Sequence, residues 1–316
     1  MILITGGLGY LGGRITHNLF RLGQPIRIGC SRQKPVLPKA LKSCEVAQLN
    51  LDDSRSLNMA CDGVKTIVHL AGMNSEMCKA NPAKALMVNG MGTLNLIKAA
   101  TEKGVKNFIY FSTVHVYGTP LNGILDETSI LRPIHPYSIT HRLAEDYLLE
   151  AISCGKMMGS VLRVSNAIGP PLTKEANCWM LVVNDLCRQV VRVKKMIFLS
   201  DRECKRDYIA IAAICNTVFS LIANDKLNDK CNGEIINITS GISTSLDELS
   251  KKISKRCKVV LGFTPQIEFH NSFNKISSEI QVISNKKAKE LGIQLESNLT
   301  NEIDNLLLSC QKWYLC

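Results

Sequence analysis

The chain has 316 residues, of which 46% are hydrophobic and 21% are charged, and its formal net charge is +11. These proportions are close to those of globular proteins and exclude a disordered, collagen-like or coiled-coil chain, while the length allows two domains or one large one. The positive residues are spread along the chain with few aromatic residues among them, so we predict neither a nucleic-acid nor a membrane partner.

Short apolar runs alternate with helical patterns in the first half of the chain. The apolar runs predict strands at residues 2–5, 26–30, 45–49, 66–71, 107–112 and 160–164. Apolar residues at helical spacing follow the first strand and stop at Gly23, and further helices are predicted at residues 53–60, 82–103 and 137–153. Strands that alternate with helices are typical of βαβ units, so we predict an α/β fold with a Rossmann, doubly wound parallel sheet.

The alternation weakens after the last of these strands, where Pro170-Pro171 and longer irregular stretches follow. We therefore predict a dinucleotide-binding domain at residues 1–165, to which residues 205–232 return, and a smaller C-terminal substrate-binding region formed by residues 166–204 and 233–316. The longest apolar stretch, residues 208–223, is interrupted by polar residues and is shorter than the ~20 residues that span a bilayer. We expect it to form a half-buried helix.

A glycine-rich segment, Thr5-Gly6-Gly7-Leu8-Gly9-Tyr10-Leu11-Gly12, lies between the first predicted strand and the first predicted helix. Glycines at 6, 9 and 12 allow a tight turn, a close approach of the backbone to a pyrophosphate, and close packing of the helix on the strand. The helix N-terminus offers unpaired N–H groups to the phosphates. We predict that this segment binds a dinucleotide.

The second predicted strand ends with Cys30-Ser31-Arg32, where a carboxylate usually holds the ribose hydroxyls of the adenosine. A hydroxyl and a guanidinium suit a 2′-phosphate, so Ser31 and Arg32 predict NADP, with NAD as the alternative. The competing interpretation is that Arg32 is a solvated loop residue. Asp52, after the third strand, is a candidate contact of the adenine edge or a helix cap.

Motifs that stand in order over most of the chain resemble those of the extended short-chain dehydrogenase/reductase family, in its NAD(P)-dependent nucleotide-sugar epimerase/dehydratase branch. The matches are Thr5-Gly6-x-x-Gly9-x-x-Gly12, His69-Leu70-Ala71-Gly72, Asn89 with Gly92-Thr93, Phe111-Ser112-Thr113-x-x-Val116-Tyr117-Gly118, Pro136-Tyr137-Ser138, Arg163-Val164-Ser165-Asn166, Gly169-Pro170, Arg206-Asp207-Tyr208 and Asn237-Ile238-x-Ser240-Gly241. The resemblance implies further cofactor contacts from Leu8, Tyr10, Leu11, Leu51, Leu70, Ala71, Gly72, Asn89 and Ser112. Many relatives dimerise through the helix that carries the tyrosine, and we expect a homodimer.

The resemblance also implies the catalytic residues. Tyr137 takes the place of the acid/base tyrosine, and Thr113 that of the residue that hydrogen-bonds the reacting sugar oxygen. The lysine that binds the nicotinamide ribose is replaced by His141, four residues after Tyr137. This spacing puts both side chains on one helical face, so Tyr137 and His141 are both expected to contact the cofactor.

Histidine in the lysine's place changes the chemistry that is expected of Tyr137. A tyrosine has a pKa near ~10, and it acts as a base near neutrality only when a positive charge lowers that pKa. A histidine is only partly charged at neutral pH. Three interpretations follow: His141 serves as the ribose ligand of a working enzyme, the enzyme works mainly in the reductive direction with Tyr137 as proton donor, or catalysis is impaired.

The residues expected at the substrate favour a nucleotide diphosphate sugar. Asn166 and Arg206 match positions that contact the diphosphate in relatives, and an amide and a guanidinium suit phosphoryl oxygens. The Asp-Glu pair of 4,6-dehydratases is replaced by Val114 and His115, which argues against 4,6-dehydration. We therefore predict hydride transfer at a sugar carbon, as a 4-epimerase or a 4-keto-reductase.

Two other interpretations compete with this enzyme. One is a non-catalytic NAD(P)-binding regulator or scaffold that lost its lysine, against which the retention of Thr113 and Tyr137 argues. The other is a dehydrogenase of a steroid or another small alcohol, which Asn166 and Arg206 disfavour.

Thirteen cysteines are scattered along the chain, and the two closest, Cys310 and Cys316, are six positions apart. No Cys-x-x-Cys motif exists, so we expect free thiols in a reducing compartment and no metal site. Met1 runs directly into a predicted strand and leaves no room for a secretory signal. These features predict a cytoplasmic protein.

Overall fold

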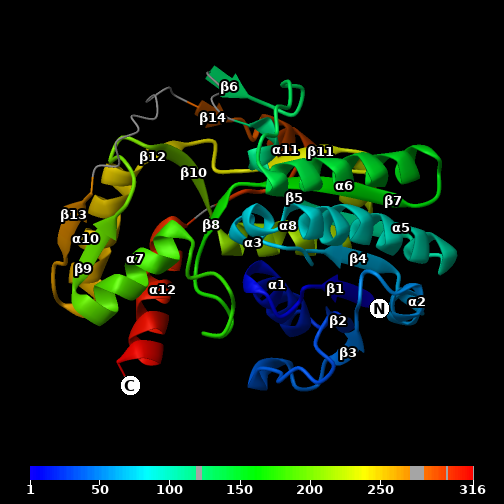
Figure 1. Ribbon diagram of the computed structural model, residues 1–316, viewed down its shortest axis with the longest axis horizontal. Helices are drawn as coiled ribbons and strands as arrows, with labels where there is room; N and C mark the ends of the chain where they lie inside the picture. Colours follow the sequence, from blue (N-terminus) through cyan, green and yellow to red (C-terminus); the bar gives the residue numbers. More distant parts are fainter. Residues whose placement is uncertain (119–122, 271–280, 297, 316) are drawn as a thin grey trace.

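The computed structural model describes residues 1–118, 123–270, 281–296 and 298–315 (Figure 1). Its centre is a seven-stranded sheet in the order β11-β7-β5-β4-β1-β2-β3, in which all neighbouring strands are parallel. The strands are β1 (Ile2–Thr5), β2 (Ile26–Cys30), β3 (Glu45–Gln48), β4 (Thr66–His69), β5 (Asn107–Thr113), β7 (Met158–Val164) and β11 (Ile235–Ile238). The predicted Rossmann, doubly wound α/β fold is confirmed.

Helices cover both faces of this sheet because its strands are apolar on both sides. Side chains alternate along β1, so Ile2 and Ile4 pack in one core and Leu3 packs in the other. The first core contains α1 (Tyr10–Arg21) and α8 (Ile211–Ala223). The second contains α2 (Ser54–Cys61), α5 (Gly92–Glu102) and α6 (Pro136–Ser153), of which α5 and α6 lie side by side in Figure 1.

The helix predicted at residues 82–103 is helical in the structure but not uniform. It begins as α4 (Pro82–Ala85), continues as the π-helical segment η2 (Leu86–Met91) and ends as α5. Single π-helical turns within an α-helix are often found at functional sites. Here η2 carries the buried Asn89, one of the predicted cofactor residues.

Two strand ends differ from the prediction for identifiable reasons. The strand predicted at residues 66–71 ends at His69. The N–H of Leu70 still reaches the carbonyl oxygen of Thr5, at 3.3 Å, but it also donates to the Thr5 hydroxyl at 3.1 Å, and the N–H of Ala71 donates to the same hydroxyl at 3.1 Å instead of continuing the ladder. The strand predicted at residues 107–112 extends to Thr113, which pairs with Val164 of β7. This extension brings Thr113 to the carboxyl end of the sheet.

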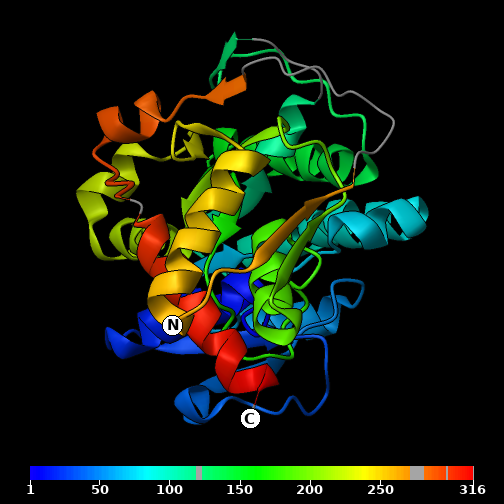
Figure 2. The same cartoon turned by 90° about the vertical axis from the view of Figure 1, so that its left-hand side faces the viewer.

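The C-terminal region forms a third apolar core beside the sheet. Its helices α7 (Val182–Val193), α10 (Leu246–Leu261) and α12 (Leu299–Tyr314) pack together, as Figure 2 shows from the side. Small sheets accompany them: β8 (Asn166–Ile168), β10 (Lys205–Ala210) and β12 (Ser243–Ser245) in one, and β9 (Lys195–Phe198) with β13 (Gln266–Phe269) in another. The remaining elements include α3 (Ser75–Ala80), α9 (Asp225–Lys230), α11 (Lys286–Leu291), β6 (Gly123–Leu125) and β14 (Gln281–Ile283).

The chain crosses between the two regions more often than the predicted boundaries allow. Helix α8, within residues 205–232, packs on α1, as the predicted return of this segment requires. Strand β11, which the prediction placed outside the dinucleotide-binding domain, instead pairs with β7 at the edge of the central sheet. Ile236 and Ile238 of β11 pack in the first apolar core, and Ile235 packs against the second.

One buried carboxylate ties the C-terminal helix to the first half of the chain. Glu302 of α12 is 3% exposed, pairs with Arg14 of α1 at 3.3 Å and accepts the N–H of Ala212 at the start of α8 at 3.0 Å. Segment 211–213 contains no acidic residue that could cap α8 itself. Glu302 therefore supplies from a distant helix the acceptor that this helix N-terminus lacks.

The described part of the chain contains no helix with the length and hydropathy of a membrane span. The twelve cysteines that the structure describes are free thiols, and most of them are buried. Burial raises the pKa of several of these thiols, for example that of Cys215 to about 12, so they remain protonated and act as small apolar side chains.

Candidate active site

The predicted site residues gather at the carboxyl ends of β1, β4 and β5. Strands β2 and β3 lie on one side of β1, whereas β4 and then β5 lie on its other side, so the strand order reverses between β1 and β4. In open α/β sheets a crevice forms at such a point, because the loops on its two sides diverge. The site described below lies at this edge of the sheet.

The glycine loop has the backbone that a pyrophosphate requires. Gly6 has a φ of +65°, and a Cβ at Gly12 would lie 2.2 Å from the carbonyl oxygen of Gly6, so neither position accepts a side chain. Gly9 is the N-cap of α1 and provides no side-chain cap for the first helical N–H groups. These groups and the positive end of the helix fit the pyrophosphate of a dinucleotide.

The side chains of Leu8, Tyr10 and Leu11 in the glycine loop make contacts within the protein. The Tyr10 hydroxyl donates to the carbonyl oxygens of Ala167 and Gly169, at 3.1 and 3.0 Å, and so joins the loop to the C-terminal region. Leu8 and Leu11 pack against the first apolar core. The side chains of these three residues are therefore engaged within the protein.

The loop after β4 lies directly against the glycine loop. A Cβ at Gly6 would lie 3.0 Å from the Ala71 nitrogen, and one at Gly72 would lie 3.0 Å from Oδ1 of Asn89. Asn89 is 2% exposed, accepts the N–H of Met73 at 2.7 Å and donates to the hydroxyl of Thr140 in α6 at 3.2 Å. It therefore holds this loop to α6, while Leu70, Ala71 and Gly72 lie next to the glycine loop.

Most of the residues predicted to contact the adenosine are exposed on the surface. Ser31 and Arg32 are exposed after β2, and the structure gives the Arg32 guanidinium no ion-pair partner among the described residues. Leu51 is buried, and its carbonyl oxygen accepts from Asn95 at 3.1 Å. Asp52 is exposed and is not the helix cap, since Asp53 caps α2 by accepting the N–H of Arg55 at 3.0 Å.

Thr113, Tyr137 and His141 come together as predicted. The rings of Tyr137 and His141 meet edge to face with centroids 4.4 Å apart, and the Thr113 hydroxyl is close enough to Tyr137 to act on its pKa. Burial raises the pKa of Tyr137 to about 12, an effect that the polar side chain of Thr113 partly offsets. Burial lowers the pKa of His141 to about 4, so its imidazole is neutral at pH 7.

The predicted substrate residues lie next to this group. Asn166 begins β8 and donates to the carbonyl oxygen of Asp207 at 2.9 Å, which places it beside Arg206 of β10. His115 follows Thr113 and its ring lies 6.4 Å from that of Tyr137. Its side chain is exposed, yet desolvation and the nearby charge of Arg206 lower its pKa.

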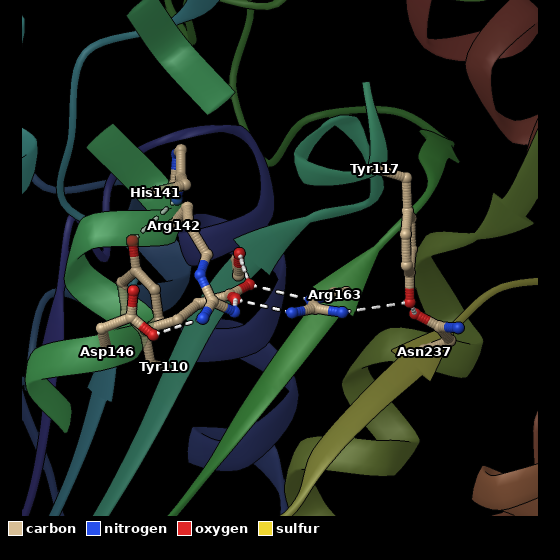
Figure 3. Close-up of polar contacts among 9 residues, drawn as sticks. Tyr110, Tyr117, His141, Arg142, Asp146, Arg163 and Asn237 are labelled. Carbon is tan, nitrogen blue, oxygen red and sulfur yellow. Dashed lines mark hydrogen bonds and ion pairs between the residues drawn. The ribbon is translucent and has the colours of Figure 1, made fainter. Parts of the chain in front are cut away.

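A buried polar network beneath these residues was not predicted from the sequence (Figure 3). Glu145 of α6 is fully buried and forms two hydrogen bonds with Arg163 of β7, at 3.0 and 2.8 Å. The Ser112 hydroxyl donates to the same carboxylate. Arg163 also donates to the Tyr117 hydroxyl at 3.2 Å, which in turn donates to Asn237 of β11 at 2.7 Å.

This network fixes the register between α6 and the sheet. Tyr110 and Ser112, two apart on β5, face the same side and contact His141 and Glu145, four apart on α6. Two strand residues and four helical residues each advance by about 6 to 7 Å, so the two sets match in spacing. The hydroxyl of Ser112 is thereby engaged with Glu145.

The sequence and the fold can be compared with those of known proteins. A model of the NAD dependent epimerase/dehydratase family matches residues 2–239. GDP-6-deoxy-D-talose 4-dehydrogenase of Aggregatibacter actinomycetemcomitans is 26% identical over 258 residues, which are 78% of this chain and 77% of that protein.

Two solved structures share the fold over nearly the whole length. UDP-glucose 4-epimerase of Thermotoga maritima, solved with UDP-glucose, superimposes with a TM-score of 0.83 at 24% identity and covers 98% of both chains. RMD from Pseudomonas aeruginosa, solved with NADPH, gives a TM-score of 0.77 at 19% identity, with 98% of this chain and 99% of that chain covered. With a family match over three quarters of the sequence, the chain belongs to the NAD dependent epimerase/dehydratase family.

Proposed function

We propose that this protein reduces a 4-keto group of a nucleotide diphosphate sugar with NADPH. The observation that carries this proposal is the neutral imidazole of His141 beside Tyr137, where no cation acts on the Tyr137 hydroxyl within the described residues. A phenol with a pKa near 12 donates a proton readily to a developing alkoxide but does not act as a base at neutral pH. Reduction needs the proton donor, whereas alcohol oxidation needs the base.

The proposed roles follow from the geometry of the site. The bound cofactor supplies the hydride. Thr113 and Tyr137 both offer hydroxyls to the sugar oxygen, and Tyr137 gives it a proton as negative charge develops there. Asn166 and Arg206 hold the diphosphate, and His141 donates a hydrogen bond to the nicotinamide ribose.

A 4-epimerase is the second candidate, favoured by the likeness in fold to a UDP-glucose 4-epimerase solved with its sugar nucleotide. Purified protein is incubated with NADPH and nucleotide-linked 4-keto sugars, and separately with NAD and the corresponding alcohols. Loss of the reduced-nicotinamide absorbance with keto sugars supports reduction. A changed sugar without net redox change, detected by chromatography, supports epimerisation. Cofactor binding without any turnover supports a regulator instead.

The pH dependence of reduction provides a sharper test. Because the pKa of Tyr137 is raised to about 12, the phenol stays protonated through the neutral and moderately alkaline range, and reduction is expected not to decline there. His141→Lys places an ammonium beside Tyr137, which favours the phenolate and lowers this pKa. We expect the alkaline decline of reduction to move to lower pH and alcohol oxidation to become faster.

The matched control for this substitution is Ser153→Lys, which adds the same charge to an exposed position at the end of α6, outside the apolar surface described below. Rate profiles against pH are measured for the parent and both variants. An unchanged profile for His141→Lys would contradict the proposed electrostatic coupling between positions 137 and 141.

The choice of NADP over NAD is proposed from Ser31 and Arg32. Arg32→Ala is expected to weaken NADPH binding by about 1.5 to 3 kcal/mol, roughly tenfold or more, because it removes a charge-assisted hydrogen bond to the 2′-phosphate. NADH binding is expected to change little. Titration calorimetry measures both affinities, with Arg55→Ala on α2 as the control. Equal losses for NADPH and NADH would argue against a 2′-phosphate contact.

We also propose that the protein is a homodimer. The adjacent segments η2 and α6 expose large apolar side chains: Leu86, Met87, Met91, Ile139 and Tyr147. A second copy would bury this surface. The double substitution Met87→Glu with Ile139→Glu is expected to give a monomer in sedimentation velocity, whereas Val259→Glu, at an exposed position of α10, is expected to leave the dimer intact. A parent protein that sediments as a monomer would contradict this proposal.

A further inference from the structure

Tyr110 lies beneath the proposed site and has no part in the reaction described above. It is 3% exposed, and its hydroxyl lies 2.7 Å from Nδ1 of His141. A dashed line marks this contact in Figure 3. Its ring stacks on that of His69 with centroids 5.7 Å apart. His69 is itself fixed by the hydroxyls of Thr5 and Thr93, at 2.6 and 3.0 Å. Tyr110 is thus held with its hydroxyl directed at His141.

The hydrogen bond between Tyr110 and His141 can be made in two ways. In one, the phenol donates to an unprotonated Nδ1, and the imidazole proton is on Nε2. In the other, Nδ1–H donates to the phenol oxygen, and the phenol proton then needs a second acceptor. The structure gives the Tyr110 hydroxyl no other hydrogen-bond partner among the described residues. A buried donor without an acceptor is costly, so the first arrangement is favoured.

We propose that Tyr110 is a positioning residue, which fixes neutral His141 in its Nε2–H form and so presents one N–H donor to the cofactor pocket. The inference rests on the proposed function only in naming the nicotinamide ribose as the group that accepts this N–H. The edge-to-face contact with Tyr137, at 4.4 Å, limits rotation of the imidazole ring. Nε2 therefore stays on the side of the ring remote from Tyr110.

This arrangement explains how a histidine can serve where a charged side chain is expected. A lysine would bring a donor and a charge together. The Nε2–H group of a neutral imidazole supplies only the donor, so cofactor binding is separated from the electrostatic effect on Tyr137. Such a site holds its cofactor while Tyr137 keeps its proton.

The tautomer can be measured without any substrate. The protein is labelled with ¹⁵N-histidine, and long-range ¹H–¹⁵N correlation spectra at neutral pH distinguish the two neutral forms of each of the six histidines. His141→Gln identifies the signals of His141 by their loss. We expect His141 in the Nε2–H form, and a partial shift to the Nδ1–H form in Tyr110→Phe. The Nδ1–H form in the parent protein would overturn the inference, even if the variant did not fold.

Cofactor affinity gives the second readout. Tyr110→Phe is expected to weaken binding of the dinucleotide by about two- to tenfold, the value of one ordinary hydrogen bond. Tyr147→Phe, which removes an exposed hydroxyl from α6, is the matched control and is expected to bind normally. Unchanged His69 signals in Tyr110→Phe verify that the fold is kept. An unaltered tautomer and unaltered affinity in Tyr110→Phe would also refute the inference.

These results separate the inference from the proposed function. A protein that turns over no sugar but holds His141 in the Nε2–H form through Tyr110 retains the inference and loses the reductase. A reductase whose His141 is in the Nδ1–H form retains the function and loses the inference.

Discussion

Tyr137→Phe is expected to reduce turnover by about two to four orders of magnitude, because it removes the group that protonates the sugar oxygen. The change deletes one hydroxyl and keeps the ring that contacts His141, so the pocket keeps its shape. Cofactor affinity is expected to remain within about twofold of the parent, since the phosphate and adenosine contacts are untouched. Single-turnover rates and calorimetric titrations measure the two effects separately.

Thr113→Val provides the comparison for this result. It removes the hydroxyl proposed to hydrogen-bond the sugar oxygen but leaves the phenol of Tyr137 in place, so a smaller loss of turnover is expected. If Tyr137→Phe retained the parent's rate, Tyr137 would not be the proton donor. His115, whose ring lies 6.4 Å from that of Tyr137, would then be the next group to test.

Arg163→Leu is expected to lower the free energy of unfolding by about 3 to 5 kcal/mol, because it leaves the Glu145 carboxylate buried without its cation. Both side chains are at most 1% exposed and share two hydrogen bonds. The Tyr117 hydroxyl also loses the bond from Arg163. Urea denaturation followed by circular dichroism measures the change. Since Glu145 is on α6, turnover is expected to fall in the folded fraction as well.

Two comparisons test the physical reason for this loss. Arg163→Met combined with Glu145→Gln removes both charges and is expected to recover part of the stability, because no unpaired charge remains buried. Lys156→Met breaks a pair with Glu150 that is exposed on both sides, and a far smaller change is expected. If Arg163→Leu were as stable as the parent, the network would not hold α6 to the sheet.

The elements and their faces could be predicted from local patterns. Alternating apolar runs predicted the strands of the sheet, and the i, i+4 spacing of Tyr137 and His141 placed both on one helical face, where their rings meet. Glycines 6, 9 and 12 predicted the turn whose geometry excludes side chains. Each of these depends on residues that are close in the chain, whose conformation is set by local sterics and periodicity.

The sequence alone therefore determined the sheet, the glycine loop and the pair at positions 137 and 141. Only the tertiary structure decided what surrounds that pair: Tyr110 against His141, Arg163 against Glu145, and Glu302 capping a helix 90 residues away. The pairing of β11 with β7 at the sheet edge was likewise decided by the tertiary structure. These contacts depend on how strands and helices pack in register, and a local pattern fixes the face of an element but not its partner across the core.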